Sequence, residues 1–291
     1  MNDVGSELDG IRFSVHTAST AEWLPEETVE RVAEAGWDGI EWATKLDDSE
    51  GGYSLKWSKA VKDGSALAER TRRAGLEIVG LNFDVLDPDT PQDKMEEAIE
   101  VAASFGAPQM RFGMPRYGSD RETALASDYG DLYARAVDKL GYAVSVAAGH
   151  GLKLLVECHH GTITPSASLA LRVAERFAPM EVGVILDPGN QVLEGFENWK
   201  LETELLGDYL AHVHCKNSAW QPGPNGGKTI AGISRNYRWE PLEQGLVDWS
   251  DVFQALRLIG YHGWISLEDF SDIPISDRLG QLGYLRRLAS T

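Results

Sequence analysis

The amino-acid sequence predicts a single (β/α)8 TIM barrel of the α/β class. Short apolar runs alternate with longer amphipathic stretches eight times along the chain, and neither a linker nor a break in composition interrupts them. The length of 291 residues suits one such barrel, which typically needs about 250 residues. We therefore expect one domain over residues 1–291.

The first four strands are expected in apolar runs at residues 11–17, 39–43, 77–83 and 108–113. Pro25 is placed to open the first helix and Gly36 to end it. The second helix is expected over roughly residues 58–74. At the third helix, Thr90 supplies an N-cap and Pro91 a first-turn proline.

The second half of the chain repeats this alternation. A long helix ends near His150, and the next strands are expected at residues 153–159, 182–187, 210–216 and 264–269. Thr164 and Pro165 are placed to begin the helix after the fifth strand. A Gly- and Pro-rich excursion covers residues 218–245, and a helix over residues 248–259 follows it.

The glycines of the chain match neither of two known phosphate-binding patterns. An open doubly wound sheet needs a Gly-rich phosphate turn after the first strand, but residues 16–19 contain no glycine. The segment over residues 220–229 is superficially similar to a phosphate-binding loop. However, three residues separate Gly223 from Gly227, where the motif has four. A mobile lid over the active site is the better interpretation of this segment.

The composition limits the partners of the protein. With 45 acidic and 27 basic residues, the chain carries a formal charge of −18. Such a surface repels phosphate backbones and anionic lipids, so nucleic acid and membranes are not expected partners. The start of the chain does not resemble a secretory signal, and two cysteines, Cys158 and Cys215, are too few for a disulfide framework. We expect a cytoplasmic protein, and the sequence leaves assembly into a homo-oligomer open.

Four consecutive strands of the second half end in side chains that bind metals, namely Glu157, Asp187, His214 and Glu268. In TIM barrels the active site lies at the carboxyl ends of the strands. Any one of these residues alone would suit an ion-paired or water-facing position at the rim. Three carboxylates and an imidazole that converge there would repel one another without a cation, because buried acids are costly unless paired or metal-bound. Together they predict a site for one divalent metal ion.

The donor set indicates which ions suit the site. Oxygen-rich ligands favour Mn²⁺, Mg²⁺ or Co²⁺ over a thiolate zinc site, with Mn²⁺ as the first expectation and Zn²⁺ as a remaining alternative. Cys158 and Cys215 each directly follow a proposed ligand. Side chains alternate along a strand, so both thiols are expected to point toward the helices as small buried hydrophobes.

Four segments, VECHHGTIT, ILDPGN, HVHCKN and GLVDWSDVFQALRLIGYHGWISLEDF, resemble the xylose isomerase-like barrels, the sugar phosphate isomerase/epimerase group. The resemblance covers nearly the whole chain and is strongest from the fifth strand onward. In that family, Glu, Asp, His and Glu at the ends of strands five to eight bind the metal, which implies the same four positions here. Its ketose 3-epimerases use both ligand glutamates as acid/base groups. The resemblance therefore implies that Glu157 and Glu268 flank the carbon whose proton moves.

The chemistry of such a site is that of proton transfer next to a carbonyl. Removing that proton leaves an enediolate, whose oxygens a cation stabilises. Two carboxylates on opposite faces allow epimerisation, transfer between adjacent carbons gives isomerisation, and loss of a β-hydroxyl gives dehydration. We expect a metal-dependent isomerase or epimerase of a small ketose, aldose or keto-polyol. A lyase, either a keto-inositol dehydratase or an eliminase of a 3-keto-glycoside, is the alternative.

Six further residues are predicted to contact the sugar-like substrate, namely His159, Asn190, Lys216, Arg238, His16 and Arg111. His159 and Lys216 occupy positions where the resembled family often has substrate contacts; a structural hydrogen bond and a solvated rim lysine are their alternatives. Asn190 stands where the resembled epimerases usually carry a histidine. Arg238 precedes Gly245 and residues 247–249 at nearly the spacing of a substrate-binding arginine in the resembled epimerases. Arg235 is the alternative candidate for that position.

Other polar residues near the strand ends have simpler interpretations. His160 is expected to point away from the site and cap a loop, and His212 to be a satisfied core histidine. Glu41 and Asn82 are expected in the wall of the site, where Glu41 could form an ion pair with Arg111 instead.

Two other function classes fit the sequence less well. Abasic-site endonucleases share the superfamily but bind three metals through extra histidines, where this chain offers Asn82, Arg111 and Asn190. The acidic charge also disfavours a nuclease. A sugar-binding barrel without catalysis would keep its aromatic residues and lose the four metal ligands, which are intact here.

Overall fold

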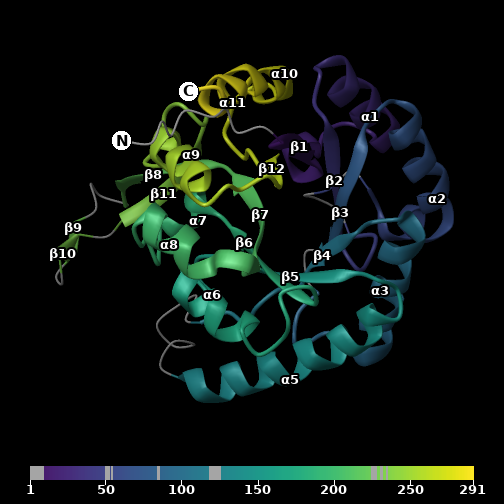
Figure 1. Cartoon of the computed structure of the whole chain (residues 1–291), viewed down its shortest axis with the longest axis horizontal. Helices are drawn as coiled ribbons and strands as arrows, with labels where there is room; N and C mark the ends of the chain where they lie inside the picture. The colour runs from purple at the N-terminus through teal and green to yellow at the C-terminus, as the bar shows by residue number, and fades with distance from the viewer. Residues whose placement is uncertain are drawn as a thin grey trace.

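The eight apolar runs form one sheet of parallel strands. The computed structural model describes residues 10–49, 53, 55–83, 86–117, 126–223, 228–229, 232–233 and 235–291. The sheet contains β1 (Arg12–His16), β2 (Gly39–Thr44), β3 (Glu77–Phe83), β4 (Gln109–Arg111), β5 (Lys153–Glu157), β6 (Val182–Leu186), β7 (Leu210–Cys215) and β12 (Trp264–Leu267). Their order is β3-β2-β1-β12-β7-β6-β5-β4, and β3 also lies against β4. The sheet thus nearly closes on itself, which confirms the predicted (β/α)8 barrel (Figure 1).

Helices surround the barrel and cover its apolar outer surface (Figure 1). Those between the strands are α1 (Pro25–Glu34), α2 (Trp57–Arg73), α3 (Gln92–Phe105), α5 (Tyr129–Ala148), α6 (Ala167–Ala174), α7 (Pro188–Gln191), α8 (Trp199–Leu206) and α9 (Trp249–Leu258). The chain ends in α10 (Ile275–Gly280) and α11 (Leu282–Ala289), and two short 3-10 helices are η1 (Thr17–Thr20) and η2 (Gly207–Tyr209). Each longer helix buries a stripe of apolar side chains against the strands, as its sequence pattern predicts.

Two predicted helix caps are wrong. Pro91 is the N-cap of α3 without a side-chain hydrogen bond, and the Thr90 hydroxyl instead accepts from the backbone of Asp87. Ser166, and not Thr164, caps α6. Both threonines lie further from the helix than expected because the turn before each helix is longer. The Thr164 hydroxyl donates instead to the carbonyl of Glu157 (3.0 Å) and so holds the end of β5.

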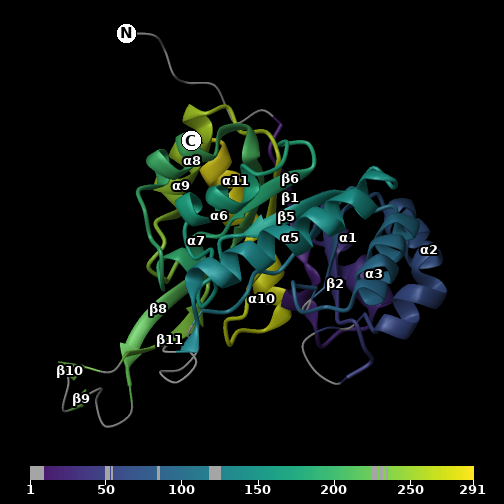
Figure 2. The ribbon, with the colours of Figure 1, turned by 90° about the horizontal axis from the view of Figure 1, so that it is seen from below.

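The Gly- and Pro-rich excursion contains an antiparallel ribbon. β8 (Asn217–Pro222) pairs with β11 (Arg235–Glu240), and the short strands β9 (Lys228–Thr229) and β10 (Gly232–Ile233) lie at its outer end, away from the barrel (Figure 2). Much of the predicted lid is thus β-structure. Its tip at residues 224–227 lies outside the described residues.

The two cysteines behave as small apolar residues. Both are free and fully buried in the packed core, as predicted. Burial raises the pKa of both thiols well above the usual range, which keeps them protonated. Among the described residues, no helix is both long and apolar enough to cross a membrane.

Candidate metal centre

Four side chains of metal-ligand type meet at the carboxyl ends of the strands. Glu157 is the last residue of β5, His214 lies in β7, and Asp187 and Glu268 directly follow β6 and β12. Each offers one ligand atom, and these atoms all lie within 4.8 Å of one another. All four residues are buried. The structure thus brings together the four predicted ligands, while their role as ligands stays a prediction.

Asp187 is oriented by the short helix that follows it. It is the N-cap of α7, and its Oδ1 accepts a hydrogen bond from the backbone N–H of Asn190 (2.9 Å). Pro188 occupies the first turn, where a missing N–H costs no helical hydrogen bond. The other carboxylate oxygen, Oδ2, faces the cluster and lies 3.8 Å from His214 Nδ1.

Lys216 places a positive charge among the three carboxylates. Its Nζ lies 2.8 Å from Asp187 Oδ2 and 4.0 Å from Glu157 Oε1, and it forms a shorter ion pair with Glu268. The residue is only 3% exposed, so the alternative of a solvated rim lysine is wrong. The glycine at position 189 leaves room for Lys216, because a Cβ there would lie 2.4 Å from Lys216 Cγ and 2.7 Å from the Lys216 carbonyl oxygen.

The charges around the cluster set the protonation of its carboxyl groups. Burial alone would raise the pKa of Glu157 and of Glu268. Arg111 beside Glu157, and Lys216 beside Glu268, nevertheless hold both pKa values below their usual range. Burial, together with the neighbouring carboxylates of Glu157 and Glu268, raises the pKa of Asp187 to about 8. The charge of Lys216 offsets only part of this rise.

The donor set fits a hard divalent cation. Three carboxylates and one imidazole nitrogen are the ligands that Mn²⁺ and Mg²⁺ accept, and buried negative charge needs a positive counterpart. Burial alone would lower the pKa of the Lys216 ammonium, but Asp187, Glu268 and Glu157 raise it. The cluster therefore stabilises a cation, as a metal site must.

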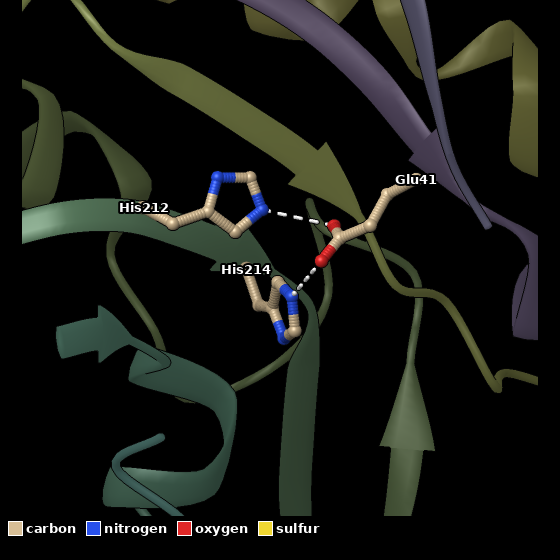
Figure 3. Close-up of side chains that lie close together, drawn as sticks. All are labelled: Glu41, His212 and His214. Atoms are coloured by element: carbon tan, nitrogen blue, oxygen red, sulfur yellow. Dashed lines mark hydrogen bonds and ion pairs between the residues drawn. The ribbon is translucent and has the colours of Figure 1, made fainter. Parts of the chain in front are cut away.

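Residues of the first half of the chain contact these ligands. Arg111 Nε lies 2.5 Å from Glu157 Oε2, as an ion pair whose N–H is not aligned for a hydrogen bond. The alternative of an ion pair between Glu41 and Arg111 is therefore wrong. Glu41 instead accepts from Nε2 of His212 (2.9 Å) and of His214 (3.2 Å), as Figure 3 shows. His212 is a buried core histidine, as predicted.

His16 lies beside the fourth ligand. Its Nδ1 accepts a hydrogen bond from the backbone of Ala18 (3.3 Å) and is 3.7 Å from Glu268 Oε1. Its ring meets that of His214 edge-on, with 5.4 Å between the centroids. Burial lowers the pKa of His16, so the ring is neutral near pH 7. The structure thus places His16 at the site, as expected of a substrate contact.

Asn190 connects two ligands to a residue that the sequence reasoning missed. Its Nδ2 donates to Asp187 Oδ2 (2.8 Å) and Glu157 Oε1 (3.3 Å), and its Oδ1 accepts from His160 Nδ1 (2.7 Å). The expectation that His160 points away is wrong. That expectation assumed that side chains continue to alternate between the two faces of a strand after Glu157. β5 ends at Glu157, however, and the next residues follow a different backbone path.

A cavity opens above the cluster. Of the predicted substrate contacts, His16, Arg111, His159 and Lys216 line it. His159 is neutral near pH 7, because burial lowers its pKa to about 4. Aromatic residues complete the wall, namely Tyr53, Phe83, Trp239 and Phe270.

Two of these rings also contact the lysine of the cluster. Lys216 Nζ lies 5.3 Å from the ring centroid of Trp239 and 5.4 Å from that of Phe270. The sequence indicates only weakly that these two rings belong to the site. Phe270 follows Glu268 by two residues, and Trp239 belongs to an excursion without helical or barrel-strand periodicity.

The structure does not bring Arg238 to the cluster. Its side chain is 63% exposed and forms an ion pair with Glu240. Successive side chains of a strand point to opposite faces, so its neighbour Trp239 lines the cavity and Arg238 does not. The competing Arg235 lies at the far end of β11, opposite Pro222 of β8.

Comparisons with known proteins agree with this architecture. A family model described as xylose isomerase-like TIM barrel matches residues 29–288. Inosose dehydratase from Geobacillus thermodenitrificans is 22% identical over 246 residues, covering 76% of this chain and 78% of that protein. Two inosose dehydratases from Lacticaseibacillus casei are 24% identical over 157 residues, about half of each protein.

Solved structures share the fold at low sequence identity. The 3-keto-D-glucoside 4-epimerase from E. coli has a TM-score of 0.71 at 16% identity, over 95% of this chain and 99% of that one. A xylose isomerase-like TIM barrel protein from Mycobacterium smegmatis in complex with magnesium has a TM-score of 0.68 at 17% identity, over 98% of both chains. From the family match over most of its length, this chain belongs to the xylose isomerase-like TIM barrel family.

Proposed function

We propose that the protein is a metal-dependent isomerase or epimerase that moves a proton next to the carbonyl of a small sugar-like ketone or aldehyde. The observation that carries this proposal is the pair Glu157 and Glu268. Both are buried beside cations that keep them ionised, and both face one cluster. They come from β5 and β12, which β6 and β7 separate in the sheet. Two bases that approach from different sides can remove a proton from one face and return one to the other.

Glu157, Asp187, His214 and Glu268 would hold one divalent ion, for which we propose Mn²⁺. When bound, such an ion stabilises the negative charge that develops on the oxygens of an enediolate. Glu157 and Glu268 would act as the two acid/base groups. His16, Arg111, His159 and Lys216 would orient the hydroxyl groups of the substrate. Asn190, predicted as a substrate contact, does not line the cavity and would instead hold Asp187 and Glu157 in place.

The charges in the cavity favour a neutral substrate. Arg111 already pairs with Glu157, and Lys216 with Asp187 and Glu268. Among the described residues that line the cavity, no other lysine or arginine remains to meet a phosphate group. A phosphorylated sugar would therefore have to break an existing ion pair.

A dehydratase of a keto-polyol is the second candidate, and the similarity to inosose dehydratases favours it. Dehydration begins with the same proton abstraction and then needs an acid for the departing β-hydroxyl. The ammonium of Lys216 lies beside Glu268 and could donate that proton.

Both candidates can be tested with one substrate panel in D₂O. We expect neutral keto-sugars to gain deuterium at the reacting carbon and to yield an epimer or isomer by NMR. A dehydratase would instead convert keto-inositols with loss of water. Turnover of sugar phosphates far above that of the free sugars would contradict the neutral-substrate proposal.

The Glu268→Gln variant tests the assignment of the bases. We expect turnover to fall by about two to four orders of magnitude, the usual contribution of a general base. Metal binding should weaken and persist, since the amide keeps one oxygen ligand. Near-normal turnover in both Glu157→Gln and Glu268→Gln enzymes that still hold metal would contradict the assignment and make His159 the next candidate.

A further inference from the structure

A second group of buried polar residues lies next to the proposed metal ligands, within the barrel (Figure 3). Glu41 of β2 is 1% exposed and receives hydrogen bonds from three side chains. His212 Nε2 lies 2.9 Å from its Oε2, while His214 Nε2 (3.2 Å) and Asn82 Nδ2 (2.5 Å) meet its Oε1. Asn82 is oriented by the backbone N–H of Arg111, which donates to its Oδ1 (2.8 Å).

These contacts determine where the proton of each imidazole lies. The amide of Asn82 must present its NH₂ group to Glu41, because its oxygen already accepts from Arg111. Glu41 is then a carboxylate that accepts from every partner, so His212 and His214 must each carry a proton on Nε2.

His214 therefore presents its other nitrogen to the proposed metal ligands. Its Nδ1 lies 3.3 Å from Glu157 Oε1, 3.4 Å from Glu268 Oε2 and 3.8 Å from Asp187 Oδ2. A metal-binding histidine commonly donates its second N–H to a carboxylate, which fixes the ring and makes it a stronger ligand. Glu41 stands in that relation to His214.

A second metal ion between Glu41, His212 and His214 is the competing interpretation, since their ligand atoms also lie close together. It would require the loss of both Nε2 protons. The distances are those of hydrogen bonds, and the Asn82 amide already occupies one coordination direction of Oε1. His212 Nδ1 has no hydrogen-bond partner among the described atoms, as suits a neutral ring with its proton on Nε2.

We propose that Glu41 is a positioning residue, which holds the Nε2 proton of His214 and thereby directs its Nδ1 lone pair toward the metal. The proposal rests on the metal centre proposed above. His212 completes the arrangement by occupying the second oxygen of Glu41, so that this carboxylate cannot turn away from His214.

The Glu41→Gln variant tests this role through metal affinity. A glutamine either turns its NH₂ group to His214, which must then carry its proton on Nδ1, or keeps its oxygen there and offers a neutral acceptor in place of a carboxylate; both make His214 a weaker ligand. We expect Mn²⁺ affinity to fall about 10- to 100-fold, measured from the free Mn²⁺ signal in electron paramagnetic resonance. The melting temperature of the metal-free protein should change little. The matched control is Glu202→Gln, another buried glutamate, whose described hydrogen bonds come from Gln191 and Glu197 and not from His214, and which should keep normal affinity.

A second measurement uses the unmodified protein and does not depend on how variants fold. With ¹⁵N-labelled histidine, Nε2–H signals of His212 and His214 should be protected from solvent. One equivalent of Zn²⁺ should shift Nδ1 of His214 and leave both Nε2–H signals in place. Their loss at a second equivalent would overturn the positioning role in favour of a second metal site.

The outcomes separate this proposal from the metal centre itself. Normal Mn²⁺ affinity in Glu41→Gln would overturn only the role of Glu41. If the unmodified protein binds neither Mn²⁺ nor Zn²⁺, the metal centre fails, and this role fails with it.

Discussion

The two halves of the barrel contribute different chemistry to one site. β5, β6, β7 and β12 end in the four side chains of metal-ligand type. Of the first half, His16 at the end of β1 meets Glu268 and His214, Glu41 within β2 meets His214, and Arg111 at the end of β4 meets Glu157. The comparison shows an unequal contribution: the second half supplies all four side chains together with Lys216 and Asn190, which pair with them, whereas the first half only contacts the four.

The largest effect is expected from removing a donor of the second half. Asp187→Ala should lower metal affinity by more than the roughly 100-fold that an outer partner such as Glu41 can cost. Elemental analysis of the purified variant should find most of the metal gone. Chelation should lower the melting temperature of the unmodified protein, because a ligand stabilises the folded state that binds it. Equal occupancy in the variant and the unmodified protein would remove the distinction between the two halves.

A smaller effect is expected from replacing Lys216, the buried cation of the second half. Lys216→Met should lower the free energy of unfolding of the metal-free protein by about 3–5 kcal/mol, because three buried carboxylates lose their ammonium partner. Urea denaturation measures this loss, and added Mn²⁺ should restore much of it. Lys153→Met is the control, since this partly buried lysine of β5 forms no ion pair with the residues that the structure describes. Equal stability of the two variants without metal would contradict the charge balance described here.

The smallest effect concerns a carboxyl group outside the cluster. Burial raises the pKa of Glu202 to about 8, whereas its ordinary value is 4.5. Between these pH values the folded protein keeps a proton that the unfolded chain loses, so the free energy of unfolding falls as pH rises through this window. Glu202→Gln should remove this dependence, a contribution on the order of 4 kcal/mol at pH 8. Identical pH profiles by thermal denaturation would show that Glu202 is ionised throughout.

The convergence of the four proposed ligands was predictable from sequence because its signal is positional. Each of Glu157, Asp187, His214 and Glu268 stands at the end of an apolar run, and parallel strands bring such ends to one rim. The barrel itself was predictable for the same reason, since its strands and helices repeat one local pattern.

The partners of these ligands were not predictable in the same way. Arg111 and Glu41 were given an ion pair with each other as the alternative to lining the site, and they instead contact Glu157 and His214. Such pairings depend on which side chains meet across the interior of the barrel, and no spacing along the chain records this. His160 was misplaced because strand alternation applies only as far as β5 extends.

The buried ammonium of Lys216 also bears on how the protein is made. A cluster of three carboxylates with its own cation can reach the folded state in a cell that offers little metal. A metal ion bound at the cluster would then share these carboxylates with Lys216 instead of being the sole source of positive charge. We therefore expect the protein to fold before it takes up metal, so that metal supply does not limit its folding.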